Sequence, residues 1–157
     1  MATTYKPVGP RDLVKIAREA AALVKVAHTI SAIAEDDIGV PCGVTSDEAV
    51  RFNAAGALIR VTWRRMYDMT SLVEGGVLCP WADDGMLYYA VSRIVAPDDF
   101  REWQSAPGRT GSDVAAVLNR AADLIGRALA VAEPTSDGDG AIVRDLVDLI
   151  EGASDAA

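Results

Sequence analysis

Helical periodicity of the apolar residues is the feature that most constrains how this 157-residue chain folds. From Pro10 onward, apolar side chains recur every three or four residues, which places them along one side of a helix. The members of this stripe are Leu13, Ile16, Ala17, Ala20, Leu23, Val24, Ala27, Ile30 and Ile33. Gly and Pro are too dense between Asp36 and Val44 for regular structure, so we predict a long core-facing helix that ends before Asp36.

A second helix is predicted from Thr45 to about Met69. Thr45 and Glu48 have the spacing of a capping box, in which a hydroxyl and a carboxylate bind reciprocal backbone N–H groups. The stripe that follows consists of Val50, Ala54, Ala57, Leu58 and Val61. Gly56 lies within this helix, and its missing side chain would allow another backbone segment to come close.

The remaining helices are predicted from their start and stop signals. A third helix follows Asp83-Asp84 and ends at Pro97, and a short helical turn is capped by Asp98 or Asp99. Thr110 and Asp113 open a fourth, long helix. We therefore predict an all-α, single-domain bundle of three long and two or three short helices. Its parts are an N-terminal arm (1–9), a helical domain (10–133), a flexible link (134–140), an amphipathic helix (141–151) and a disordered tail (152–157).

Charge and hydropathy argue against two classes of partner. The chain has 15 basic and 23 acidic residues, so nucleic acid or an anionic membrane would meet a repulsive average field. The most apolar stretch, Ala20 to Ala34, is interrupted by Lys25 and His28 and is shorter than the roughly 18 apolar residues of a membrane span. Residues 1–10 lack the apolar core of a secretory signal, so we expect a cytoplasmic protein.

Metal, cofactor and nucleophilic chemistry find little support in the sequence. Cys42 and Cys79 lack Cys-x-x-Cys partners and His28 is the single histidine, so we expect neither a metal site nor a cofactor. The sequence is compatible both with two free thiols at Cys42 and Cys79 and with a disulfide between them. Asp137 to Gly140 resembles a calcium loop, but Leu146 replaces the bidentate Glu. His28, placed in the first helix beside the core stripe, is expected to be neutral and partly buried.

Paired carboxylates give the most specific functional hint. Asp47-Glu48, Asp83-Asp84 and Asp98-Asp99 fall at predicted helix N-termini, where the dipole stabilises negative charge. Glu35 to Asp37 instead falls at a predicted helix C-terminus, where the dipole opposes it. Either the helix ends earlier, or this cluster meets a cation or a basic partner.

Arginines form the other charged group that needs a role. Arg51, Arg60, Arg64 and Arg65 would place a small cationic stripe on the second helix, although a solvated face or pairing with carboxylates explains it better than nucleic-acid binding. Arg109 has no helix-capping role, and a solvated charge would account for it, as would binding of an anion or a carboxylate.

The segment Pro107-Gly108-Arg109-Thr110, preceded by Trp103, resembles an uncharacterised domain-of-unknown-function family of actinobacteria and their phages. In that family a Trp-Asn-Asp segment leads into Gly-Arg-Thr and a helix, and a Cys-x-x-Gly-Ala motif lies on an earlier helix. Here Trp103-Gln104-Ser105 and Asn53 to Ala57 occupy those places, with Asn53 where the family has Cys. The resemblance spans roughly Leu13 to Leu129 and implies a small helical domain without an established activity.

Two functions are carried forward from the sequence. The first is a non-catalytic protein that binds a protein partner or itself, most simply as a homodimer. Two groups of residues support it: the aromatic and Met residues near the connectors, and the apolar face of the last helix with Ile142, Leu146, Leu149 and Ile150. The alternative is a small-molecule-binding protein or enzyme, whose ligand-binding residues would be Glu35, Asp36, Asp37, Trp103 and Arg109.

Overall fold

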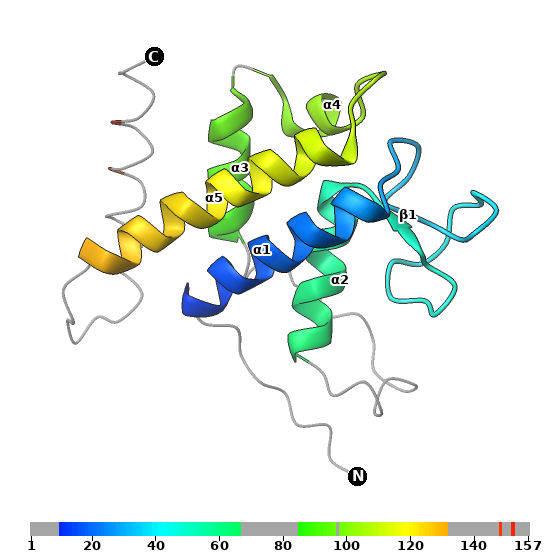
Figure 1. Cartoon of the computed structure of the whole chain (residues 1–157), viewed down its shortest axis with the longest axis horizontal. Coiled ribbons are helices and arrows are strands. Elements are labelled where there is room, and N and C mark those ends of the chain that lie inside the picture. The colour runs from blue at the N-terminus through cyan, green and yellow to red at the C-terminus, as the bar shows by residue number, and fades with distance from the viewer. Residues whose placement is uncertain (1–9, 67–84, 97, 132–147, 149–151, 153–157) are drawn as a thin grey trace, which may run out of the picture.

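The structure, a computed structural model, describes residues 10–66, 85–96, 98–131, 148 and 152 (Figure 1). The helices are α1 (Pro10–Val26), α2 (Ala54–Met66), α3 (Gly85–Val95), α4 (Phe100–Gln104) and α5 (Gly111–Val131), and the strands are β1 (Ala34–Glu35) and β2 (Arg51–Phe52). The predicted helical class is confirmed for this part of the chain, but the predicted set of three long and two or three short helices is not. The small antiparallel sheet of β1 and β2 was not predicted.

The antiparallel pair α1 and α5 forms the centre of the molecule, with α2 packed on α1 and α3 packed on α5 (Figure 1). Both central helices bury alanines, which have no bulk to hold the helix axes apart. These are Ala17, Ala20, Ala21, Ala115, Ala121, Ala122 and Ala128. At the surface of the pair, Arg18 donates to Asn119 Oδ1 at 3.1 Å and to Asp123 Oδ1 at 2.6 Å.

The first helix ends at Val26, so the prediction that it extends to Ile33 was wrong. The carbonyl of Ala27 accepts a hydrogen bond from Phe52 N at 2.8 Å, and Thr29 N donates to Phe52 O at 3.1 Å. The chain therefore leaves the helix to pair with β2. Ile33, predicted to lie on the buried stripe, is instead exposed.

The second helix begins at Ala54, so the predicted capping box of Thr45 and Glu48 was also wrong. Asn53 caps the helix, because its Oδ1 accepts from Gly56 N at 2.8 Å. From α4, Gln104 Oε1 accepts from Ala55 N at 3.2 Å. The prediction for Gly56 is confirmed, since a methyl group there would overlap the backbone of Ile33.

The helices with strong local start signals agree with prediction. Asp99 caps α4, with its Oδ1 accepting from Arg101 N at 2.8 Å. Thr110 and Asp113 open α5 as predicted, and they form a reciprocal cap: Thr110 N donates to Asp113 Oδ2 at 2.9 Å, and Asp113 N donates to Thr110 Oγ1 at 3.2 Å. Hydrogen bonds from the Thr110 backbone and side chain lower the pKa of the Asp113 carboxyl.

Several predictions fall outside the described residues. They include the 1–9 arm, the 134–140 link, the calcium-like loop and the 141–151 helix with its four partner-binding residues. The same holds for Cys79 and for Tyr67 and Trp81, which are two of the aromatic residues near the connectors. Among residues 10–66, 85–96 and 98–131, no helix has the length and apolar character needed to cross a membrane.

Candidate functional site in the connector between α1 and α2

The connector from Ala27 to Asn53 is a long segment in which β1 and β2 are the only regular elements. Structureless connections longer than roughly 12–15 residues are uncommon in compact domains and are usually functional or disordered. This one is ordered, because its buried members tie it to the helices. They are Thr29, Ala34, Glu35, Ala49, Phe52 and Asn53.

Backbone pairing assembles the connector around the small sheet. Phe52 pairs with Ala34 on one side and forms a parallel bridge to His28 on the other, while Glu35 pairs with Arg51 and forms an antiparallel bridge to Pro41. Pro41 lies at the outer edge of this arrangement and has no N–H to offer a further strand. The edge is therefore closed to simple strand addition.

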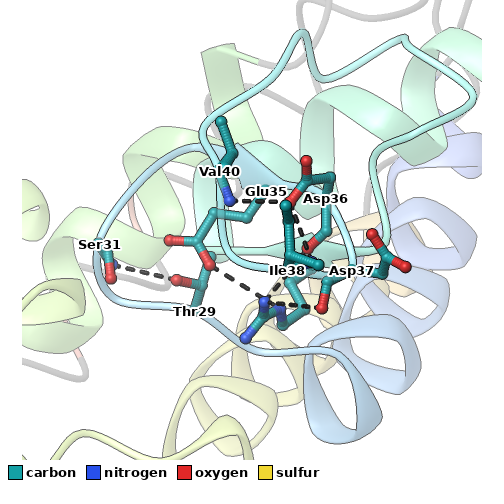
Figure 2. Close-up of polar contacts among 8 residues, drawn as sticks. Thr29, Ser31, Glu35, Asp36, Asp37, Ile38 and Val40 are labelled. Atoms are coloured by element: carbon teal, nitrogen blue, oxygen red, sulfur yellow. Dashed lines mark hydrogen bonds and ion pairs between the residues drawn. The ribbon is translucent and has the colours of Figure 1, made fainter.

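Asp36 holds the first turn of the connector (Figure 2). Its Oδ1 accepts from Ile38 N at 3.1 Å and from Val40 N at 2.8 Å, and its own N donates to Val40 O at 3.0 Å. Gly39 completes the turn with φ of 88°, a conformation that residues with a Cβ rarely adopt. The carboxylate of Asp36 is thus used to shape the loop.

Arg51 fastens the same turn from β2. Its Nη2 donates to the carbonyls of Asp36 at 3.2 Å and Asp37 at 3.4 Å, and its Nε lies 3.8 Å from Glu35 Oε2. Glu35 is only 4% exposed, whereas the Asp37 side chain is exposed. Because α1 ends at Val26, these acids do not lie at a helix C-terminus, and the predicted conflict with a helix dipole disappears.

Arg60 supports the second half of the connector from α2. This side chain is 3% exposed, and its Nη1 donates to the carbonyls of Val44 at 3.2 Å and Ser46 at 3.1 Å. Arg65 pairs with Glu19 and Asp12, so the four arginines do not form the single stripe that their spacing suggested. Hydrogen bonding to backbone carbonyls explains why Arg60 is buried, and no residue spacing in the sequence predicts such a role.

Exposed apolar side chains gather on this connector. In the part of the chain that the structure describes, the exposed large apolar residues are Val26, Ile33, Ile38, Val40 and Val50. We call Ile38, Val40 and Val50 the apolar cluster; they are 80%, 51% and 44% exposed. Each of their backbone N–H groups is bound to Glu35 or Asp36, with Val50 N donating to Glu35 O at 2.9 Å. One hydrogen-bonded framework therefore presents all three side chains.

Trp103 and Arg109, the two residues of the predicted ligand site that are not acidic, form a local pair. Arg109 Nε donates to Trp103 O at 3.1 Å, and its guanidinium lies 4.1 Å from the Trp103 ring centroid. Arg109 thus binds a backbone carbonyl in the last turn of α4, a structural role that the sequence did not predict. Within the described residues, no hydrogen bond or ion pair joins this pair to Glu35, Asp36 or Asp37.

His28 lies just beyond α1, where the connector meets β2, and not in the middle of a helix as predicted. Its side chain is half-buried, and its Nε2 has no hydrogen-bond partner. Burial lowers the pKa of His28, while the nearby Asp113 opposes that shift. A neutral imidazole at pH 7 agrees with the sequence-based expectation.

Cys42 lies in the connector, near its acidic side chains. Burial raises the pKa of this thiol, and the charges of Asp36, Glu48 and Glu35 add to the shift while Arg60 opposes it. Among the described residues, no group of three or more His, Cys, Asp or Glu side chains is arranged to hold a metal ion.

We expect Cys42 to react with iodoacetamide more slowly than a free cysteine, because the thiolate is the attacking species. Alkylation followed by mass spectrometry from about pH 7 to 10 should give an apparent pKa above that of an unperturbed thiol. Glu48→Gln removes one of the raising charges and should shift that apparent pKa downward. If Cys42 of the unsubstituted chain were alkylated as fast as free cysteine, this account would be contradicted.

Comparison with protein-family models, curated proteins and solved structures finds no match to this chain.

Proposed function

We propose that this protein is a non-catalytic binding protein whose α1 to α2 connector docks on another protein. The observation that supports this proposal is the apolar cluster of Ile38, Val40 and Val50 on an ordered loop. Single exposed apolar side chains are common, but three of them held by one hydrogen-bonded loop give apolar area that a partner could cover. Here they come from one segment.

The hydrogen bonds of the connector favour binding by a preformed surface. Asp36 and Arg51 fix the turn that carries Ile38 and Val40, so little backbone freedom is left to lose when a partner binds. Two of the acidic side chains nearby have internal roles: Glu35 pairs with Arg51, and the Asp36 carboxylate binds backbone N–H groups. These contacts support a recognition role in preference to acid–base chemistry.

Self-association as a homodimer through Ile142, Leu146, Leu149 and Ile150 stays a separate prediction, because these residues lie outside the described part of the chain. Light scattering at micromolar concentration tests it, and a 16.5 kDa species throughout would contradict it. The cytoplasmic location and the resemblance to the actinobacterial and phage family also stay predictions.

The docking proposal can be tested by photo-crosslinking in cells that produce the protein. With a photoreactive amino acid in place of Ile38, we expect a discrete adduct with another protein, and with the same group in place of the exposed Asp98 on the α3 to α4 turn we expect none. Val40→Ser should weaken the adduct, because it removes apolar contact area from the cluster.

A matched control is available for that substitution. Val26→Ser makes the same change at a valine that is more exposed than Val40 (84% against 51%) and lies at the end of α1, outside the apolar cluster, so it should leave the adduct unchanged. Exposed positions tolerate such changes with little effect on stability, so both variants should fold. An adduct that appears equally from positions 38 and 98, or that survives Val40→Ser, would overturn the proposal.

A further inference from the structure

The charge of the connector identifies the chemistry of its partner. From Val26 to Val50 the chain contains five acidic residues and no Lys or Arg. They are Glu35, Asp36, Asp37, Asp47 and Glu48. Such a run of one sign, in a segment that also exposes the apolar cluster, gives the surface a combined apolar and anionic character.

Three of the five carboxylates form neither an ion pair nor a hydrogen bond within the described structure, although the charge of Asp47 acts on Arg60 and the Arg51 guanidinium lies at the Asp37 carbonyl. Glu35 pairs with Arg51, and the Asp36 carboxylate binds two backbone N–H groups. Asp37, Asp47 and Glu48 are exposed, and none of their carboxylates forms an ion pair or hydrogen bond with the described residues. Asp37 directly precedes Ile38, and Asp47 and Glu48 lie just before Val50.

We infer that the occupant of the apolar cluster is a cationic segment of another protein, one in which Lys or Arg residues flank exposed apolar side chains. This inference rests on the proposed docking function. Its apolar side chains would cover Ile38, Val40 and Val50, while its cations would approach Asp37 and Glu48. Complementary charge of this kind suppresses wrong partners and speeds encounter.

A second copy of this chain fits the surface poorly. In a two-fold symmetric dimer, each patch meets the same patch of its partner. The exposed acids Asp37, Asp47 and Glu48 of one copy would then face those of the other, while the nearby Arg51 is already engaged by Glu35 and by the carbonyls of Asp36 and Asp37. Like charges brought together at an interface weaken association.

The closed edge of the sheet restricts how the cationic segment binds. Because Pro41 offers no N–H at the outer edge, a continuous strand cannot extend the sheet there. At this edge recognition must therefore rely on side chains, which is the mode in which an amphipathic helix or a loop presents apolar anchors among charged residues.

The inference can be tested with two synthetic probes, an amphipathic Leu/Lys peptide and its counterpart with Gln in place of Lys. Binding to the full chain is measured by fluorescence anisotropy. We expect the Lys peptide to bind at least about tenfold more tightly than the Gln peptide, with a dependence on salt that reflects ion pairing. Asp37→Asn together with Glu48→Gln should lower the affinity for the Lys peptide by about tenfold and leave the affinity for the Gln peptide unchanged.

A matched pair of substitutions separates a local effect from net charge. Asp98→Asn with Glu102→Gln removes the same two charges from exposed positions around α4 and should change binding of the Lys peptide by less than about twofold. Equal losses from the two pairs, or equal binding of the two peptides, would overturn the inference. So would a dimer of the free chain that Ile38→Ser abolishes, because a second copy would then be the occupant.

The apolar variant distinguishes failure of the inference from failure of the proposed function. Ile38→Ser should weaken the binding of both peptides, because it removes apolar contact area. If Ile38→Ser weakens binding while Asp37→Asn with Glu48→Gln has no effect, the docking surface stands, but the inference that its partner is cationic is wrong. If Ile38→Ser changes neither peptide, the docking surface itself is wrong, and the inference falls with it.

Discussion

Replacing Gly56 with alanine is expected to destabilise the protein by about 3 kcal/mol, at the upper end of what overpacking usually costs. A methyl group at this position would overlap the carbonyl oxygen of Ile33 and lie 2.9 Å from the carbonyl carbon. Neither backbone can retreat easily, because Ile33 O also accepts from Asn53 N at 3.2 Å and Asn53 caps α2. Urea unfolding followed by circular dichroism measures the loss.

Gly126 provides the control, because the same substitution there should have the opposite sign. It lies within α5, and a methyl group at this position would meet no atom within 4 Å. Gly126→Ala should therefore stabilise the protein by up to about 1 kcal/mol, the usual difference in helix propensity. If Gly56→Ala were also stabilising, the close approach of the connector to α2 would be refuted.

The contrast between these glycines shows what the sequence could and could not predict. That Gly56 allows a close approach could be predicted, because a glycine inside an apolar helical stripe is costly without a packing reason. That the approaching segment is Ile33 could not, since the periodicity placed Ile33 on the first helix. Pairing with β2, which lies far along the chain, ends that helix at Val26.

The same distinction explains which elements were predicted well. The caps of α4 and α5 use neighbours three residues apart or fewer, so Asp99 and Thr110 could be identified from the sequence. The start of α2 depends on Asn53 and on Gln104, which comes from a distant helix. Thr45 and Glu48 matched the capping pattern equally well, and the sequence had no means of rejecting them.

The candidate site was located in part from the sequence. Glu35 to Asp37 stood out because charge and helix dipole disagreed, but that reason fails because α1 ends at Val26; in the structure Glu35 and Asp36 instead hold the turn of the connector. Arg51 and Arg60 were missed as its supports, because their partners are mostly backbone carbonyls. The available signal was a stretch without Lys or Arg, dense in Gly and Pro, that ends at an arginine.

Phe52 is the side chain whose loss should affect both stability and the connector. It is 2% exposed and belongs to the hydrophobic core, although helical periodicity did not place it on any stripe. Its backbone pairs with Ala27 and Thr29 on one side and with Ala34 on the other. Because its ring is buried in the core, the side chain anchors this small sheet to the helices. Phe52→Ala should therefore destabilise the protein by about 3–5 kcal/mol, the usual range for a buried Phe.

Phe52→Leu is the matched variant, because it keeps an apolar side chain and should cost less than about 1.5 kcal/mol if the core repacks around it. Amide hydrogen exchange adds a local readout: the Thr29 and Val50 amides, which donate to Phe52 O and Glu35 O, should lose protection in Phe52→Ala before amides within α5 do. Equal protection loss in both places would mean that the connector does not open separately. A loss of stability below about 1 kcal/mol in Phe52→Ala would place the ring outside the core.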